Sequence, residues 1–142
     1  MKAAKKQKLE MAQEALSQVG LLEKAHRLPN QISGGEKERV AIARSIVNEP
    51  PVLLADEPTG NLDTKTSREI MELLKKLNRK GMTIAMVTHS PECAGYAQRI
   101  MRVADGKLVG DNSNVRSLDQ WQRKETLPDQ NQAVAVGNLT TG

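Results

Sequence analysis

Aromatic side chains are almost absent from this sequence of 142 residues, which contains no Phe and has Tyr96 and Trp121 as its only aromatic residues. Proteins that bind single-stranded nucleic acid stack bases on several aromatic side chains, and this sequence offers no such set. The formal net charge of +4 is small, and the lysines at positions 2, 5, 6 and 8 are interpreted as the solvated end of a helix. We therefore expect no nucleic-acid partner.

Cysteine and long apolar runs are also scarce. Cys93 is the only cysteine, which excludes a disulfide within the chain and fits a reducing cytoplasm. No apolar run approaches the ~20 residues that a transmembrane helix needs, and the first eight residues lack the apolar stretch of a secretory signal. Length and a hydrophobic fraction of 38% indicate a single domain with a modest core. The sequence therefore predicts a cytoplasmic domain.

The first chemically informative motif is Ser33-Gly34-Gly35-Glu36, which has the spacing of a capping box. In this motif Ser33 caps a helix and Glu36 folds back onto the first turn. The two glycines leave backbone N–H groups bare at the positive end of the helix, where a phosphate can approach without meeting a Cβ atom. A plain helix N-cap is the alternative for these four residues taken alone.

The second motif is a buried strand that ends in two carboxylates. Residues 52–55 form a short apolar run without alternation, which is typical of a parallel strand covered on both faces. Asp56 and Glu57 follow directly, at the strand end where open α/β sheets bind ligands. One carboxylate can hold Mg²⁺ while its neighbour orients and deprotonates a water. An acidic turn, favoured by Pro58 and Gly60, is the alternative.

The remaining pattern alternates helices and strands. Apolar residues at helical spacing predict helices over about residues 5–19, from Gly34 to before Pro50, and from the cap Asp63 to near Gly81. A second buried strand is expected over residues 83–87, reached through a helix as in a right-handed parallel crossover. Asp105-Gly106 predicts a hairpin between residues 99–104 and 107–109.

His89 follows the second buried strand, in the sequence Thr88-His89-Ser90. A lone histidine at such a place often serves only as a structural hydrogen-bonding group. We nevertheless include His89 in the candidate site, because the carboxyl ends of neighbouring parallel strands share one edge of a sheet and Asp56 and Glu57 occupy that edge.

Together these residues resemble a known family. Residues 32–36, 53–58 and 60–63, followed by His89, look like the signature motif, Walker B motif, D-loop and histidine loop of ATP-binding cassette (ABC) ATPases, in the family's order. The resemblance implies a P-loop NTPase-like α/β fold, with a parallel sheet and flanking helices. It covers a partial ATPase domain over residues 1–110, and we expect a polar, loosely ordered extension over residues 111–142.

The phosphate-binding Walker A loop of the family, its glutamine-bearing Q-loop and its N-terminal strands do not occur in the sequence. ATPases of this type surround the β- and γ-phosphates with a Gly-x-x-x-x-Gly-Lys-Ser/Thr loop, and the only Gly-Lys here, Gly106-Lys107, is followed by Leu108 and lies in the expected hairpin. The resembling part corresponds to the C-terminal half of the family's cassette. We therefore expect an incomplete cassette that is unlikely to hydrolyse ATP alone.

The resemblance also implies residue roles. Two cassettes would form a head-to-tail dimer on an integral membrane permease, at the inner face of the cell membrane, with ATP and Mg²⁺ bound between them. Asp56 would hold Mg²⁺, Glu57 would act as general base, and His89 would contact the γ-phosphate. The residues expected to contact nucleotide or to link the two sites are Ser33, Gly34, Gly35, Glu36 and Asp63.

Three functional hypotheses remain open. The first is a transporter ATPase. Glu36 stands where the signature motif more commonly has glutamine, and a glutamate there resembles the lipoprotein-release and macrolide-export branch of the family. The alternative is a non-catalytic module that docks on a complete cassette or permease and lends its signature motif. DNA-repair and chromosome-structure ATPases rank third, because no long heptad segment is present to form their coiled coils.

Overall fold

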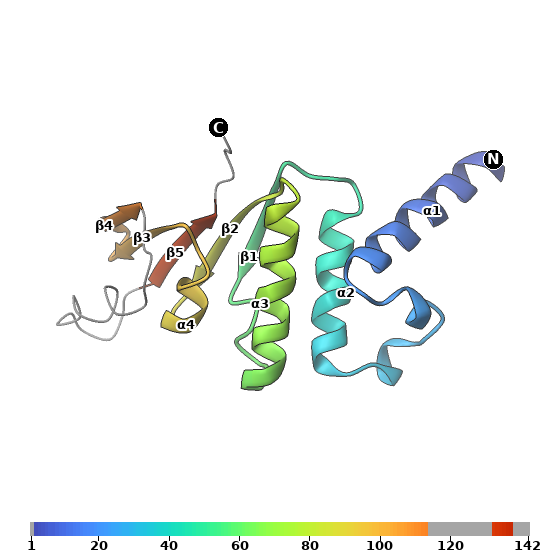
Figure 1. The fold of residues 1–142 in the computed structure, drawn as a ribbon, viewed down its shortest axis with the longest axis horizontal. Helices are drawn as coiled ribbons and strands as arrows, with labels where there is room; N and C mark the ends of the chain where they lie inside the picture. Colours follow the sequence, from blue (N-terminus) through green and yellow to red (C-terminus); the bar gives the residue numbers. More distant parts are fainter. Residues whose placement is uncertain (1, 114–131, 138–142) are drawn as a thin grey trace.

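The chain folds as three packed helices beside a mixed five-stranded sheet (Figure 1). The structure is a computed structural model and describes residues 2–113 and 132–137. Its elements are α1 (Lys2–Gln18), η1 (Leu22–Lys24), η2 (Pro29–Gln31), α2 (Gly34–Ile46), β1 (Val52–Asp56), α3 (Thr64–Arg79), β2 (Thr83–Thr88), α4 (Pro91–Ala94), β3 (Arg99–Ala104), β4 (Lys107–Ser113) and β5 (Gln132–Gly137).

The strand pairing confirms two predictions. β1 and β2 are parallel and adjacent, with Asp56 opposite Val87, and α3 connects them. β3 and β4 form the predicted antiparallel hairpin. Its turn residues Asp105 and Gly106 have φ angles of 49° and 71°, the positive values that a two-residue hairpin turn of this kind requires.

A central strand was not predicted. The sheet order is β1-β2-β5-β3-β4, and β5 is antiparallel to both β2 and β3. Much of the expected extension over residues 111–142 lies outside the described residues, but β4 continues to Ser113 and residues 132–137 form β5. Six residues without a periodic pattern around them gave too little signal to predict a strand that joins the sheet through distant pairing.

α3 covers one face of β1 and β2 and contributes more buried apolar residues than any other described element. Its apolar stripe, which includes Ile70, Leu74 and Leu77, is buried against Leu53 of β1 and the inward side chains of β2. This arrangement confirms the helix predicted from apolar residues at helical spacing between Asp63 and Gly81. In the part of the chain that the structure describes, no helix is long and apolar enough to cross a membrane.

The expectation that β1 is covered on both faces is wrong for this structure. Leu53 is buried, whereas Leu54 is 78% exposed and Val52 is 45% exposed. Successive side chains of a strand point to opposite faces, and the face opposite α3 carries no layer of described residues over Leu54. The apolar run therefore forms a strand buried on one side.

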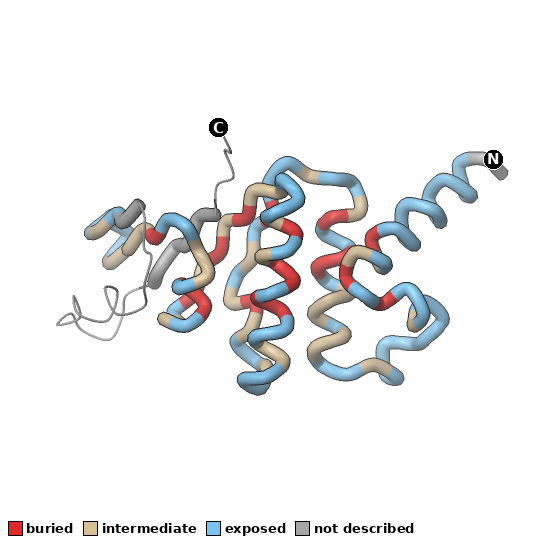
Figure 2. The backbone as a smooth tube through the Cα atoms, viewed as in Figure 1, coloured by how far each residue is buried: buried red, intermediate tan, exposed pale blue. Residues whose placement is uncertain are grey.

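α2 packs between α1 and α3 (Figure 1). A guanidinium group of α2 links the residue that follows α1 to α3. Arg39 of α2 donates to the Val19 carbonyl, 3.2 Å away, and to Glu69 Oε2 of α3, 3.3 Å away. Only the C-terminal part of α1 reaches the core, where Ala15 is buried. Leu9 is 59% exposed, because the N-terminal part of α1 extends past α2 (Figure 2).

Candidate functional site

The first part of the candidate site is the start of α2, where the predicted capping box is present. Ser33 N donates to Glu36 Oε2 at 2.8 Å, and Glu36 N donates to Ser33 Oγ at 3.3 Å. Lys24 of η1 pairs with Glu36 Oε1. The hydrogen bond from Lys24, followed by that from the Ser33 N–H, lowers the pKa of Glu36 from 4.5 to about 2. The Glu36 carboxylate is therefore ionised at neutral pH and held against the helix start.

The two glycines of this motif lie against the first turn of α3 and the loop before it. A Cβ atom on Gly35 would lie 2.3 Å from Thr66 Cγ2, and one on Gly34 would lie 3.8 Å from Leu62 Cδ2. Gly35 therefore has a packing role in addition to leaving its N–H group accessible, because no larger residue fits against Thr66 without movement.

Asp63 caps α3 as predicted. Its Oδ1 accepts from Thr66 N at 3.0 Å and its Oδ2 accepts from Thr66 Oγ1 at 2.6 Å. These bonds, the hydroxyl's first, lower the pKa of Asp63 from its ordinary value. Thr66 joins Asp63 to Gly35, so the structure places the expected nucleotide-contacting residues in one cluster at the starts of α2 and α3.

The second part of the site lies at the carboxyl ends of β1 and β2. Glu57 Oε1 accepts from the backbone N–H of His89 at 2.9 Å and lies 2.6 Å from His89 Nδ1. Glu57 has a positive φ of 44°, and its N–H donates to the Val87 carbonyl at 2.9 Å. The predicted meeting of these groups at one sheet edge is confirmed, with Asp56 exposed beside them.

Thr88 is a site residue that the sequence analysis did not identify. It is 1% exposed, and its hydroxyl donates to Glu57 Oε2 at 3.3 Å and accepts from Ser90 N at 3.0 Å. A hydroxyl directly after the apolar run of residues 84–87 was the available signal. Both oxygens of Glu57 thus have donors, which fixes the carboxylate at the sheet edge.

A cleft of about 250 Å³ opens beside this carboxylate. Glu57 and His89 line it together with side chains from α3 and α4, among them Arg68 and Glu92, which form an ion pair at 3.2 Å. His89 is 75% exposed at this cleft. The edge of the sheet is therefore accessible to a ligand or to a second protein.

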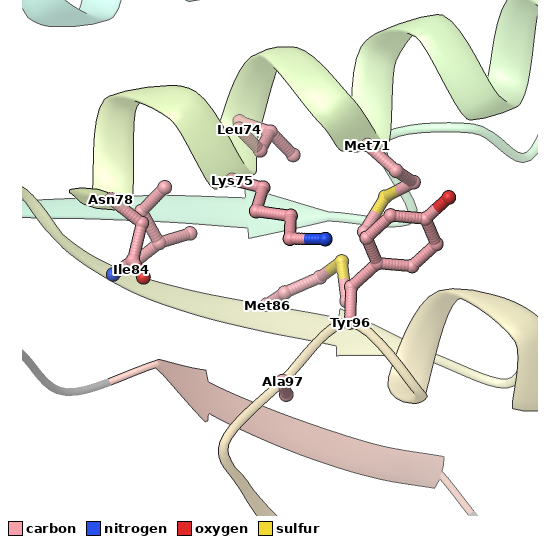
Figure 3. A pocket seen from close by; sticks show the side chains of 8 residues that line it. All are labelled: Met71, Leu74, Lys75, Asn78, Ile84, Met86, Tyr96 and Ala97. Atoms are coloured by element: carbon pink, nitrogen blue, oxygen red, sulfur yellow. The ribbon is translucent and has the colours of Figure 1, made fainter. Parts of the chain in front are cut away.

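A smaller cavity of about 50 Å³ lies elsewhere, between α3 and β2 (Figure 3). Figure 3 shows Met71, Met86 and Tyr96 grouped around it, with Lys75 Nζ 5.6 Å from the centre of the Tyr96 ring. Partial burial raises the pKa of Tyr96. The lining of this cavity is largely apolar and includes no carboxylate or histidine, so we interpret the cavity as imperfect packing under Tyr96.

Comparison with known proteins identifies the family and the fold. A family model described as ABC transporter matches residues 1–60. YknY of Bacillus subtilis, an uncharacterized ABC transporter ATP-binding protein, is 53% identical over 116 residues, covering 82% of this chain and 50% of that relative. The macrolide export ATP-binding/permease protein MacB of Chlorobium luteolum is 50% identical over 105 residues, which cover 74% of this chain and 16% of MacB.

The solved structure of an ATP-binding cassette is also similar to this chain. The ATP-binding cassette MJ0796, determined as a dimer in a post-hydrolysis state with ADP and Pi bound, matches with a TM-score of 0.63 and 44% identity, covering 76% of this chain and 47% of that protein. The chain thus spans about half the length of YknY and of MJ0796. The chain belongs to the ABC transporter ATP-binding protein family and covers part of its cassette.

Proposed function

We propose that this chain is the part of an ABC transporter ATPase that carries the hydrolytic carboxylate, Glu57, and the signature helix, which is α2. The observation that supports this function most directly is the contact between Glu57 and His89, 2.6 Å apart at the carboxyl ends of two parallel strands. A carboxylate and an imidazole held at an accessible sheet edge are suited to activating a water and to contacting a phosphate oxygen.

In this proposal Glu57 is the general base. Its carboxylate is oriented by the His89 N–H and by the Thr88 hydroxyl, so it can accept a proton from a water without having to reorganise. His89, which is largely exposed, can donate to a phosphate oxygen from its imidazole. Both groups act on the same small region of space, as phosphoryl transfer to water requires.

Asp56 is the residue proposed to hold Mg²⁺. The residues that the structure describes contain no group of three His, Cys, Asp or Glu side chains able to hold a metal by themselves. The single carboxylate of Asp56 still fits Mg²⁺ that arrives with a nucleotide. This ion takes one or two carboxylates from a protein and fills its other positions with water and phosphate oxygens. When bound, the ion would neutralise charge that develops on the phosphates.

The residues at the start of α2 are proposed to face a nucleotide held by a second cassette. Ser33, Gly34, Gly35 and Glu36 surround N–H groups at the positive end of a 13-residue helix. Asp63, which is connected to Gly35 through Thr66, would link this surface to the partner's site. The assembly we propose is a head-to-tail pair with MgATP between the subunits, bound to a membrane permease at the inner face of the membrane. The dimeric structure of MJ0796 and the combined ATP-binding/permease protein MacB support it.

A second candidate function is a non-catalytic module that lends its signature helix to a complete cassette. It is favoured by one sequence observation: the 142 residues contain no Gly-x-x-x-x-Gly-Lys-Ser/Thr loop to hold the phosphates of a nucleotide. The two candidates share the start of α2 and differ in whether Glu57 takes part in turnover.

The test uses MJ0796 as the complete cassette. ATP turnover is measured for MJ0796 alone, for this chain alone and for mixtures, with the wild-type chain, Glu57→Gln and Ser33→Ala. If the chain contributes as an enzyme, it adds turnover that Glu57→Gln lowers by about 10²–10⁴-fold. If it acts as a module, the chain changes the rate of MJ0796 equally with and without Glu57, and Ser33→Ala diminishes the effect. A mixture that behaves as MJ0796 alone excludes the module, and added turnover that Glu57→Gln leaves unchanged excludes Glu57 as the general base.

A further inference from the structure

An ion pair connects the connector before α2 to the signature helix itself. Lys24, the last residue of η1, pairs with Glu36 Oε1, while Glu36 Oε2 accepts from Ser33 N at 2.8 Å. The Glu36 side chain is 19% exposed and that of Lys24 is 40% exposed. The ion pair was not evident from the sequence, because Lys24 and Glu36 are 12 positions apart and lie on different elements.

The position of Glu36 creates an electrostatic conflict. Its carboxylate lies in the first turn of α2 and occupies the Ser33 N–H, at the helix end that would otherwise favour an anion. Like charges a few ångströms apart repel more strongly at a protein surface than in water, because the effective dielectric constant is lower there. An uncompensated Glu36 would therefore oppose a polyphosphate at this helix start.

We propose that Lys24 is a positioning residue that holds the Glu36 carboxylate aside and neutralises its charge, so that the start of α2 can receive the polyphosphate of a nucleotide bound to a partner cassette. This inference rests on the proposed function. Lys24 acts through Glu36 and is not required to touch the nucleotide. Its ammonium group provides the positive charge that a glutamine at position 36 would make unnecessary.

The geometry distinguishes this pair from an ordinary surface ion pair. The pair between Lys6 and Glu10 lies within α1 at 3.8 Å, with side chains that are 79% and 61% exposed. Such exposed pairs contribute little and are screened by salt. The Lys24–Glu36 pair is shielded on the Glu36 side and shares its carboxylate with the cap of the signature helix, so its loss changes the charge at a defined place.

The experiment measures association of the full 142-residue chain with MJ0796. A fluorescent label on Cys93 would disturb a buried residue, so the label is attached to MJ0796 and unlabelled chain is titrated with and without Mg²⁺ and a slowly hydrolysed ATP analogue. Lys24→Gln is expected to raise the nucleotide-dependent Kd on the order of tenfold. Lys24→Arg should stay within about twofold of wild type, since it keeps the charge.

The decisive comparison is made in a Glu36→Gln background. There, Lys24→Gln should leave the Kd within about twofold of Glu36→Gln alone, because no carboxylate remains to be neutralised. A role of Lys24 in folding alone would weaken binding equally in both backgrounds. Lys6→Gln, which removes the same charge and an ion pair far from the signature, serves as the matched control and should not change the Kd.

Three results would decide the matter. An unchanged Kd for Lys24→Gln, or an equal loss in the Glu36→Gln background, overturns the role of Lys24 while leaving the proposed function intact. A wild-type chain that never associates in a nucleotide-dependent way overturns the proposed use of the signature helix, and this inference with it. If Lys24→Gln fails to fold by circular dichroism, Lys24→Gln with Glu36→Gln still tests the idea, because a Kd more than about twofold above that of Glu36→Gln alone overturns it.

Discussion

Gly35 and Thr66 meet so closely that a Cβ atom on Gly35 would lie 2.3 Å from the Cγ2 methyl group of Thr66. The hydroxyl of Thr66 donates to Asp63 Oδ2 at 2.6 Å. Rotation of the Thr66 side chain away from Gly35 would break this bond. The start of α2 and the first turn of α3 are therefore fitted to each other at a residue without a side chain.

Gly35→Ala should destabilise the chain by about 1–3 kcal/mol, the usual cost of adding a methyl group where none fits. Thr66→Ser removes the opposing methyl and keeps the hydroxyl, so Gly35→Ala should be tolerated in that background. Gly34→Ala is the matched control, because its Cβ would lie 3.8 Å from the nearest atom. Urea unfolding of the four variants tests the fit, and an equal cost at both glycines would contradict it.

The motifs that depend on neighbouring residues were predicted well. The capping box at Ser33, the cap at Asp63 and the turn at Asp105-Gly106 are all local, so their hydrogen bonds follow from a few adjacent side chains. The meeting of Glu57 and His89 was predicted because parallel strands connected through a helix end at the same edge.

Contacts between distant elements could not be predicted. Lys24 and Thr66 approach the signature helix only because η1 and α3 pack beside α2, and nothing in their local sequence indicates this. The position of β5 between β2 and β3 likewise depends on pairing between segments more than 25 residues apart. The exposure of Leu54 depends on which elements cover the sheet. An apolar run indicates that its side chains favour burial, but it does not indicate whether other elements cover both faces of the strand.

β1 offers a direct test of burial on one face. Leu53→Ala should destabilise the chain by about 2–5 kcal/mol, because Leu53 is buried under α3 and its truncation leaves a cavity. Leu54→Thr should change the free energy of unfolding by no more than about 0.5 kcal/mol, since this residue is 78% exposed. Urea unfolding by circular dichroism measures both, and a large loss for Leu54→Thr would mean that another layer covers that face.

The cap of α2 should contribute to stability independently of any ligand. Ser33→Ala removes the oxygen that accepts from Glu36 N and should cost about 1 kcal/mol. Ser45→Ala is the control within the same helix: its hydroxyl donates to the Ala41 carbonyl at 3.0 Å, a bond that does not stabilise a helix interior. The control should stay within about 0.5 kcal/mol of wild type. Equal losses at the two serines would show that Ser33 is not acting as a cap.

The lowered pKa of Glu36 predicts a specific acid sensitivity. A carboxyl group whose pKa is lower in the folded state stabilises the fold above its unfolded pKa, and this contribution is lost as pH falls through the folded value. For Glu36 the loss extends from about pH 4.5 down to about pH 2. Asp63 and Asp111 also have lowered pKa values, so the wild-type chain should lose stability in acid for several reasons.

Glu36→Gln isolates the contribution of this residue, because the other carboxyl groups are the same in both proteins. Between pH 6 and pH 3 the urea midpoint of the wild-type chain should fall further than that of Glu36→Gln. Lys24→Gln should reduce the difference between the two proteins, since the hydrogen bond from Lys24 is the largest cause of the lowered pKa. Parallel loss of stability in the wild type and Glu36→Gln would mean that Glu36 titrates with its ordinary pKa in the folded chain, contrary to the pairing with Lys24.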